Sequence, residues 1–272
     1  MWDYYEDGYL TSRAYFAFDT DDRLPDYLRE YLNTAIRNGD EKTVLSVFKQ
    51  AFCLQEIETE NPSSLHLAVK EGNEDIVKML LVGGAYVNDG SGKRGCGETP
   101  LMWAAKYKKP EIAKLLLYYG GRLDNEDKEC GKTPLHFAAE SGCAATVEVL
   151  ILWGVARHMK IVDATDKDEK TPLHLAVEKQ NADAVELLIK YADPNIVDRY
   201  GCTPLHYAAK TGNLEIVRML SRRWPRQDIR DNRGYRPIDY AVSCKHAEVE
   251  NLLSFSNMVY QQLAHDAGRT RD

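Results

Sequence analysis

Apolar and polar positions recur along this chain in a pattern typical of paired helices. The clearest example is residues 203–220, where an apolar stretch with two alanines precedes a Gly-Asn pair and an Ile-Val-x-x-Leu stretch follows. Thr203 can cap the first helix, and Pro204 fits its first turn because a missing N–H breaks no hydrogen bond there. The second stretch places its apolar residues on one stripe of a helix. The segment therefore predicts a helix, a glycine-containing turn and a second helix.

The start of the first predicted helix recurs as a short motif. Four strong copies read Thr-Pro-Leu-His, or Thr-Pro-Leu-Met in one case, and a weaker copy lies on either side of them. The six copies begin at Ser63, Thr99, Thr133, Thr171, Thr203 and Arg236. Neighbouring starts are 32 to 38 residues apart. A motif that returns at such a spacing indicates a repeat architecture.

Both the motif and its period resemble the ankyrin-repeat family, whose signature is TPLHxA at a period of about 33 residues. A degenerate earlier copy also fits, because residues 35–44 align with residues 68–77. The resemblance covers about residues 27–254 in seven repeats, between an acidic aromatic segment (1–26) and a C-terminal tail (255–272). It implies an all-α fold, an ankyrin-repeat α-solenoid of helix-turn-helix units joined by β-hairpin loops. The first and last repeats lack TPLH, as expected of capping repeats.

Four regions depart from the repeat pattern, and the sequence predicts that they lie in the hairpin regions. A Gly-rich stretch at 90–95 lengthens the second repeat, and about five extra residues around 155–168 lengthen the fourth. The fifth repeat lacks the usual glycine at 191–193, and the sixth has Arg-Arg-Trp-Pro-Arg at 222–226. Insertions in a solenoid usually map to loops on one face, often the binding face.

The composition is that of a soluble globular chain, with 44% hydrophobic and 28% charged residues over 272 positions. No apolar run reaches the length of about 20 residues that a membrane-spanning helix needs, and the N-terminus does not resemble a secretory signal. Six cysteines without a CxxC pair indicate free thiols in a reducing compartment, the cytoplasm with the nucleus as an alternative. A net charge of −7 argues against nucleic acid or an anionic membrane as the partner.

Histidines raise the question of a metal site, because the chain contains seven. His66, His136, His174 and His206 occupy the same repeat position, so successive ones should lie on the order of 8–10 Å apart. Zinc ligands approach the ion to about 2 Å, so these side chains cannot converge on one metal. The resemblance implies instead that this histidine bonds backbone groups in the hairpins.

No catalytic motif accompanies the repeats. The sequence holds no GxSxG, no P-loop and no dinucleotide-binding glycine motif. The repeats also leave too few residues at either end for a separate catalytic domain. We therefore predict that the protein is not an enzyme and holds neither a cofactor nor a metal.

Charge is distributed unevenly. Residues 1–26 carry a net charge of −5 and seven aromatic side chains, which fits a capping arm, a disordered tail or a partner-binding segment. Residues 221–236 carry a net charge of +4 from six arginines and two aspartates. Because these arginines share one predicted hairpin region, we expect them on one side of the solenoid, where arginine suits carboxylate or phosphate. An acidic partner segment, the chain's own residues 1–26 and plain solvent are the alternatives at this cluster.

Ankyrin proteins bind partners mainly through hairpin tips and the exposed face of the first helices, and the resemblance carries this over position by position. The candidate partner-binding residues are Lys106, Tyr107, Lys128, Glu129, Lys132, Glu140, Lys170, Arg199, Tyr200, Lys210, Arg222, Arg223, Arg226, Arg233 and Tyr235. Trp103, Phe137 and Tyr207 are interpreted as packing residues. The predicted surface is mixed in charge and names no particular partner protein.

Three functions fit the sequence. The preferred one is a non-enzymatic protein–protein interaction module, a scaffold, adaptor or inhibitor, that grips its partner through hairpin tips and the concave helix face. A substrate-recognition adaptor of a ubiquitin ligase is an alternative, because residues 24–32 resemble the end of a SOCS box. That stretch precedes the repeats, however, and most of the box is missing. The other alternative is an IκB-like inhibitor of a transcription factor, although the DSGxxS motif of that group is absent.

Overall fold

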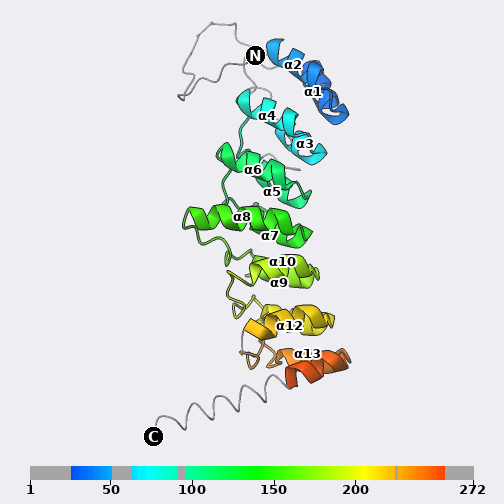
Figure 1. Cartoon of the computed structure of the whole chain (residues 1–272), viewed down its shortest axis with the longest axis vertical. Coiled ribbons are helices and arrows are strands. Elements are labelled where there is room, and N and C mark those ends of the chain that lie inside the picture. The colour runs from blue at the N-terminus through cyan, green and yellow to red at the C-terminus, as the bar shows by residue number, and fades with distance from the viewer. Residues whose placement is uncertain (1–25, 51–62, 91–95, 224–225, 255–272) are drawn as a thin grey trace.

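The computed structural model describes residues 26–50, 63–90, 96–223 and 226–254. Helices along this part of the chain form pairs, and each pair packs on the next to make a long stack (Figure 1). The inner row consists of α1 (Asp26–Asn38), α3 (Ser64–Glu71), α5 (Pro100–Lys106), α7 (Pro134–Ser141), α9 (Pro172–Glu178), α11 (Pro204–Thr211) and α13 (Pro237–Ser243). The outer row consists of α2 (Glu41–Gln50), α4 (Glu74–Val82), α6 (Pro110–Tyr118), α8 (Ala144–Ala156), α10 (Ala182–Leu188), α12 (Leu214–Arg223) and a helical stretch at 247–254. The predicted all-α solenoid is confirmed.

The repeated motif explains where the inner helices begin. Before α9, Thr171 is extended and Pro172 is the first helical residue. The Thr171 backbone N–H donates to Nδ1 of His174 at 3.1 Å, and the His174 N–H donates back to the threonine hydroxyl at 3.4 Å. These bonds satisfy donors that the first turn of a helix leaves without a partner. The predicted threonine cap and the place of the proline in the first turn are both confirmed.

A residue in the left-handed conformation ends each of these short inner helices. Gly142 and Gly212 have φ values of 75° after α7 and α11, a conformation that costs glycine little. Lys108, Gln180 and Lys245 adopt similar values of 58°, 60° and 62° at the corresponding turns of three other repeats. The chain therefore reverses direction tightly whether or not glycine is present, and the outer helix follows at once.

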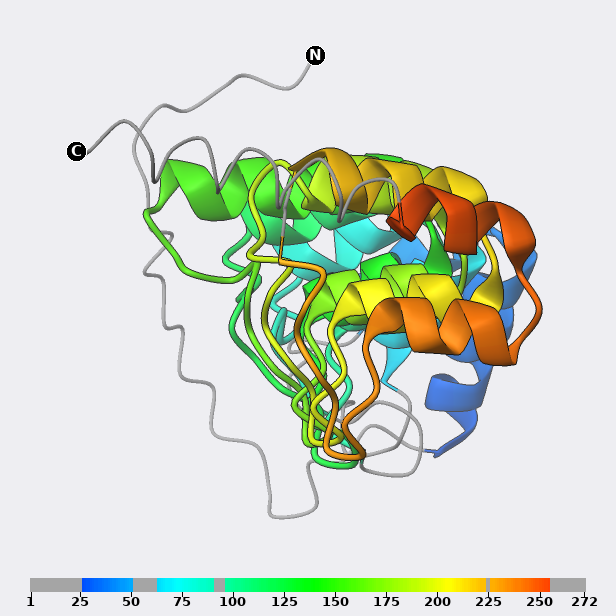
Figure 2. The ribbon, with the colours of Figure 1, turned by 90° about the horizontal axis from the view of Figure 1, so that it is seen from below.

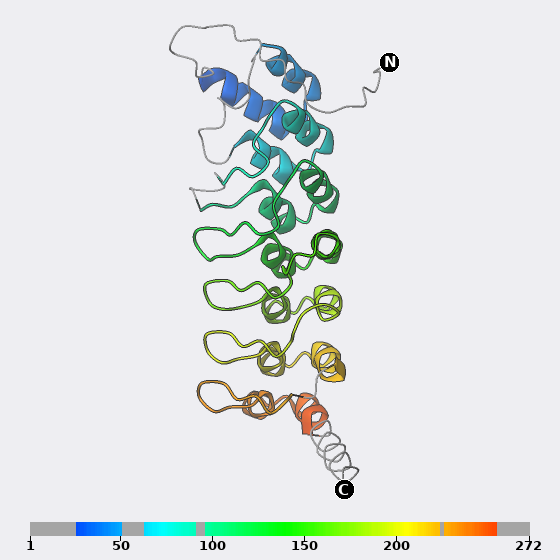
Figure 3. The same ribbon diagram turned by 90° about the vertical axis from the view of Figure 1, so that its left-hand side faces the viewer.

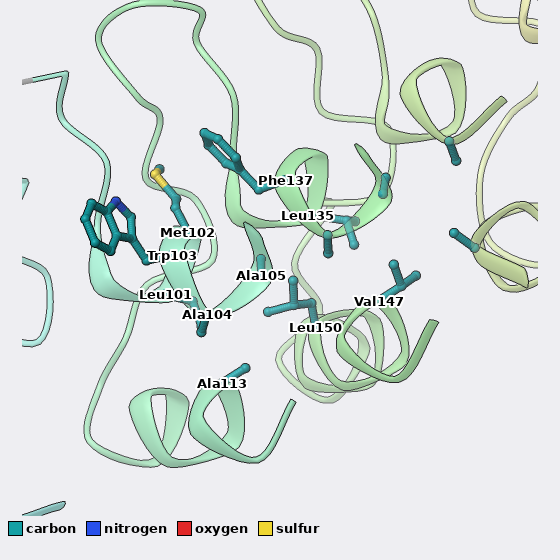
Figure 4. Packing of buried hydrophobic residues seen from close by; sticks show 14 of the residues in the cluster. Leu101, Met102, Trp103, Ala104, Ala105, Ala113, Leu135, Phe137, Val147 and Leu150 are labelled. Carbon is teal, nitrogen blue, oxygen red and sulfur yellow. The ribbon is translucent and has the colours of Figure 1, made fainter. Parts of the chain in front are cut away.

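The leucine of the motif lies at the centre of the stack. Leu101, Leu135 and Leu173 are at most 1% exposed, and Figure 4 shows Leu135 in the layer between inner and outer helices, near Leu150. The paired alanines of the motif are also fully buried in the described copies, which lets neighbouring inner helices approach closely. Because the buried apolar side chains form one continuous cluster, every repeat depends on its neighbours for burial.

Between an outer helix and the next inner helix, the chain folds into a hairpin that projects from the stack (Figure 3). At 166–170, Oδ1 of Asp166 accepts the backbone N–H groups of Asp168 and Lys170, both at 2.9 Å. Asp198 and Asp231 hold their hairpins in the same way, and both carboxylate oxygens of Asp127 accept N–H groups of its own hairpin. The hairpins close through turns, and the described residues form no β-strand.

Neighbouring hairpins are also bonded to one another. The Arg199 N–H donates to the Asp168 carbonyl at 3.1 Å, and the Asn232 N–H donates to the Tyr200 carbonyl at 3.0 Å. Viewed along the stack, the hairpins lie over one another as a single row (Figure 2). This row gives the molecule one edge made of backbone turns and polar side chains.

The extra residues of the fourth repeat do not lie where the sequence predicts. The hairpin at 166–170 is short, and α8 instead extends to Ala156, over 13 residues. α8 projects beyond its neighbours in the outer row (Figure 1). Its sequence is apolar almost throughout and contains no proline, and Gly154 lets Ile161 pack against it. A Cβ at Gly154 would lie 2.6 Å from the Ile161 side chain. The insertion therefore lengthens the outer face rather than the hairpin row.

Some expectations concern residues outside the described part of the chain. They are the acidic segment up to residue 25, the tail from residue 255, Cys53, residues 91–95 of the Gly-rich stretch, Trp224 with Pro225, and the side chain of Arg223. Of the helices that the structure describes, none combines the length and the apolar character needed to cross a bilayer.

Candidate partner-binding grooves

The hairpin row lies beside the inner helices along the stack (Figure 3), and grooves lined by residues of both form the face that we call concave. One groove on it, the charge-paired groove, has a volume of about 280 Å³ and is lined by Glu129, Lys132, Glu140, Asp166, Lys167, Asp168, Lys170, Glu178 and Lys179, among others. The adjoining tyrosine groove, of about 390 Å³, is lined by Tyr200, Cys202, His206, Tyr207, Lys210, Asp231, Asn232, Arg233 and Tyr240. Lys170 and Glu178 line both grooves, so the two are continuous.

Ion pairs fill the charge-paired groove. Nζ of Lys132 lies 2.6 Å from one carboxylate oxygen of Glu140, and Lys179 approaches the other oxygen to 3.4 Å. Lys170 and Glu178 pair at 2.7 Å. Burial favours a higher pKa for Glu140, but the contact with Lys132 outweighs it and holds that pKa below its usual value. The cations and anions of this groove therefore largely neutralise one another.

Tyrosines and aspartates build the tyrosine groove. The Tyr207 hydroxyl donates to Oδ2 of Asp198, and the Tyr240 hydroxyl donates to Oδ2 of Asp231 at 2.6 Å. The other oxygen of each aspartate accepts two hairpin N–H groups. Burial and the adjacent carboxylate raise the pKa of both tyrosines well above the usual value, so both hydroxyls stay protonated. Each tyrosine thus locks its hairpin to the helix that follows.

The motif histidines bridge successive repeats behind these grooves. Nε2 lies 3.0 Å from the Lys170 carbonyl in His136 and 3.0 Å from the Cys202 carbonyl in His174. Because Nδ1 accepts the cap N–H, the proton belongs on Nε2, which donates to these carbonyls. Burial lowers the pKa of these histidines, to about 4 for His174, so the rings are neutral. The role that the family resemblance implies for them is confirmed.

Seven of the predicted partner-binding residues line the two grooves, namely Glu129, Lys132, Glu140, Lys170, Tyr200, Lys210 and Arg233. Lys106 lies farther along the inner row, where Glu98 holds it at 2.8 Å, and Tyr107 ends α5 beside it. Three others lie in the hairpin row. The backbone N–H of Lys128 donates to the Cys96 carbonyl of the preceding hairpin, and Arg199 forms an ion pair with Asp168. The Tyr235 side chain is exposed.

The packing interpretation is correct for Trp103 and Phe137, which are almost fully buried. Tyr207 also packs against the core, but it is only partly buried and lines the tyrosine groove as well. Sequence reasoning also missed Glu178 and Tyr240. Aligning the repeats would have found both, because Glu178 lies eight residues after Lys170 as Glu140 does after Lys132, and Tyr240 occupies the position of Tyr207.

The predicted arginine cluster does not lie on one side of the solenoid. Arg222 belongs to α12 in the outer row, whereas Arg233 belongs to the hairpin row. Figure 3 shows these two rows at opposite edges of the stack. Arg226 is exposed in the connection between them, and Arg236 pairs with Asp239 at 3.1 Å. The chain crosses the stack between α12 and α13, and this crossing distributes the arginines over two faces.

The remaining candidate chemistry in the described part of the chain concerns metal-binding and thiol groups. No three His, Cys, Asp or Glu side chains gather there in a group that could hold a metal ion. The cysteines described are free thiols, namely Cys96, Cys130, Cys143, Cys202 and Cys244. Burial raises the pKa of Cys130 and Cys202, which disfavours the nucleophilic thiolate.

The sequence pattern described as "Ankyrin repeats (3 copies)" matches residues 65–161, 154–230 and 193–262. The chain belongs to the ankyrin-repeat family. It is 33% identical over 196 residues to "Putative ankyrin repeat protein FPV031" of Fowlpox virus (strain NVSL), a match that covers 70% of this chain and 46% of that protein. It is 34% identical over 124 residues to "E3 ubiquitin-protein ligase XBAT33" of Arabidopsis thaliana, covering 45% of this chain and 24% of that protein.

Among solved structures, the ankyrin array is similar to the human ASB11 ankyrin repeat domain, with a TM-score of 0.70 and 27% identity. That match covers 83% of this chain and 96% of the ASB11 domain. By contrast, the chain spans less than half the length of the viral and plant relatives. What all of them share with this chain is the array of repeats, which generally serves as a protein-interaction module rather than as an enzyme. The ankyrin-repeat chain therefore carries a protein-interaction module.

Proposed function

We propose that this ankyrin array binds a partner protein through its concave face, with contacts in the charge-paired groove and the tyrosine groove. The observation that carries the proposal is the continuity of the two grooves. Side chains from four successive hairpins and from the inner helices beside them share one surface of charged and aromatic groups. Tyrosine and arginine, both present on this surface, are among the residues enriched in protein interfaces.

The outer face offers a contrast. A groove of about 540 Å³ lies between α4, α6 and α8, lined by Lys114, Tyr118 and Trp153 among others. It has no hairpin residues along it, and Lys114 is already paired with Glu111 at 2.8 Å. Tyr118 is 77% exposed there, and Tyr200 on the concave face is 57% exposed. The two tyrosines therefore form a matched pair of probes for the two faces.

A photo-crosslinking amino acid placed at Tyr200 or at Tyr118 tests the proposal in the cells from which the protein comes. We expect a covalent adduct with a partner from Tyr200 and none from Tyr118. Adducts from Tyr118 alone would place the partner on the outer face and contradict the proposal. Circular dichroism of each variant checks that the helices are intact.

A ubiquitin-ligase adaptor is the second candidate, favoured by the 34% identity to a protein named as an E3 ubiquitin-protein ligase. The sequence stretch that resembles a SOCS box gives it no support. Asp26 begins α1, and Leu32 is completely buried in the core of the first helix pair. Immunoprecipitated protein, incubated with ubiquitin and the activating and conjugating enzymes, should build ubiquitin chains if the adaptor role is correct. An absence of chains with an active control ligase in the same assay would reject it.

We also propose a reducing compartment for the protein, the cytoplasm with the nucleus as an alternative. The free thiols of the described cysteines support this placement. Fractionation of the source cells tests it, since recovery in the secretory compartments with cysteines oxidised would contradict it.

A further inference from the structure

Two positions in each repeat face one another across the concave face, but the charges at these two positions differ from repeat to repeat. The last residue of each hairpin faces the residue eight positions later, at the end of the inner helix. Glu98 pairs there with Lys106 at 2.8 Å. Lys132 and Glu140 occupy the same two positions in the next repeat, and Lys170 and Glu178 occupy them in the repeat after that. Three successive repeats thus each place one internal ion pair on the concave face.

The next repeat breaks this series. Its hairpin ends in Cys202, so Lys210, eight residues later, has no carboxylate to pair with. The Lys210 side chain is exposed at the edge of the tyrosine groove, and no ion pair forms on it in the described structure. This repeat therefore has a lysine at the position of Lys106 but no carboxylate at the position of Glu98.

Arg233 is a second cation of the tyrosine groove that forms no ion pair within the described residues. Each hairpin is tied to the one before it, as when Arg199 pairs with Asp168 at 2.7 Å. Arg233 occupies the position of Asp168 in the last described hairpin, where no further hairpin follows within the described residues to reach it. Its guanidinium is exposed, and only its backbone N–H is engaged, by Asp231.

The acids nearby cannot neutralise these two cations. Asp198 and Asp231 are 2% and 7% exposed, and each accepts two backbone N–H groups and a tyrosine hydroxyl. Glu178, the other acid of the groove, is held by Lys170. The accessible charge of the tyrosine groove is therefore positive, although the whole chain has a net charge of −7.

We propose that the tyrosine groove binds an acidic segment of the partner protein, with a carboxylate held between Lys210 and Arg233. The inference rests on the proposed function and names its ligand chemistry. Arginine and lysine both make charge-assisted hydrogen bonds to carboxylates. Tyr200 and Tyr207 supply the aromatic wall against which an apolar or aromatic neighbour of the acidic residue packs. The segment is thus one in which acidic and aromatic residues lie next to one another.

A labelled peptide of six Glu-Tyr repeats is the probe, with a peptide of six Gln-Tyr repeats as the neutral control. Fluorescence anisotropy of the full chain at low ionic strength should show binding of the acidic peptide alone. In the double variant Lys210→Gln with Arg233→Gln, we expect the affinity to fall about tenfold. The matched control Lys160→Gln with Lys245→Gln removes two exposed charges elsewhere and should change the affinity less than about twofold.

The variant Cys202→Glu tests whether the residue at the end of a hairpin pairs with the residue eight positions later, and it removes neither cation. It recreates the Glu98–Lys106 arrangement at Cys202 and Lys210. The new carboxylate should pair with Lys210 and weaken binding of the acidic peptide about as much as Lys210→Gln does. Equal binding of the neutral peptide, or an equal loss in the Lys160 and Lys245 control, would overturn the proposal. Crosslinking from Tyr200 without acidic-peptide binding would overturn this inference alone, because the proposed function would still stand.

Discussion

The two grooves of the concave face are built from the same repeat positions and differ in how their charges are used. In the charge-paired groove, every hairpin-end lysine has its own carboxylate, as Lys132 has Glu140. In the tyrosine groove, Cys202 takes the hairpin-end position and Lys210 keeps no internal partner. The repeat scaffold therefore fixes where a side chain lies, and single residues at those fixed places decide whether the surface is already satisfied or open to a ligand.

Burial strengthens this contrast. Lys170 is 13% exposed in its side chain and Lys132 is 18% exposed, so their ion pairs are partly shielded from solvent. Opening those pairs would leave a partly shielded charge without a partner, at a cost of up to about 1 kcal/mol. Lys210 is exposed and carries no such penalty. We expect partner contacts in the charge-paired groove to come from hydrogen bonds and shape, and those in the tyrosine groove to come from charge.

The largest effect should come from the core that both grooves share. Leu135, in the inner helix of the fourth repeat, is 1% exposed. Leu135→Ala should therefore lower the free energy of unfolding by about 2–5 kcal/mol. Because repeats support one another, the loss should loosen both grooves together. Chemical denaturation measures it, with Leu152→Ala on exposed α8 as the control at under about 0.5 kcal/mol. A shift equally small for Leu135→Ala would show that Leu135 does not fill the core between the helices.

The next largest effect should be a loss of folding stability at acid pH, caused by the buried side chain of His174. The folded pKa of His174 is about 4, below the ordinary value of 6.5, because the ring is buried. As pH falls, the unfolded chain takes up this proton first, so stability is full above pH 6.5 and is lost between pH 6.5 and 4. The loss from this one site is about 3 kcal/mol by linkage. Denaturation at several pH values should show the slope, and His174→Gln should flatten it. A stability that rises toward acid would contradict the assignment.

A smaller change should make the charge-paired groove behave like the tyrosine groove. Glu140→Gln releases Lys132 and Lys179 from their shared carboxylate. The six-repeat Glu-Tyr peptide should then bind about two- to threefold more tightly, while stability changes by less than about 1 kcal/mol because the pair is partly exposed. An isothermal titration of both proteins measures the gain. Unchanged binding would mean that pairing does not distinguish the two grooves.

The smallest effect should come from the outer row. Arg222→Glu reverses an exposed charge in α12, away from the concave face. Acidic-peptide affinity should change less than about twofold at physiological salt, where charges are screened over about 8 Å. Anisotropy at two salt concentrations measures this change. A loss as large as that of Lys210→Gln would restore the single arginine patch that the sequence alone predicts.

Sequence reasoning reaches the fold because the motif encodes it locally. Thr171, Pro172 and His174 form the cap, and the spacing of the copies gives the stacking. It fails for the arginines at 222–236, because where the chain crosses from the outer row to the hairpin row is a property of the stack. It fails as well for α8, where an apolar insertion continues a helix instead of lengthening a loop.

For the grooves, the sequence reveals the residues but not their pairing. Lys132 and Glu140 both stand among the candidates predicted from hairpin and helix positions, yet only the structure shows that they bond each other. Tyr207 packs as predicted, but the sequence does not show that its ring stays half exposed in the groove or that its hydroxyl reaches back to Asp198 in the preceding hairpin. Such contacts depend on how hairpin and helix lean together, which no local pattern specifies.

The most direct test of the account observes the lysines themselves. Reductive dimethylation with a ¹³C label keeps the charge of each lysine and gives it an NMR signal, which substitutions can assign. On titration with the six-repeat Glu-Tyr peptide, the Lys210 signal should move first and furthest, while the signal of Lys132, which lines only the charge-paired groove, should stay nearly in place. Movement of the Lys132 signal or of exposed Lys160 as large as that of Lys210 would contradict the claim that Lys210 is open to a ligand while Lys132 is held by Glu140.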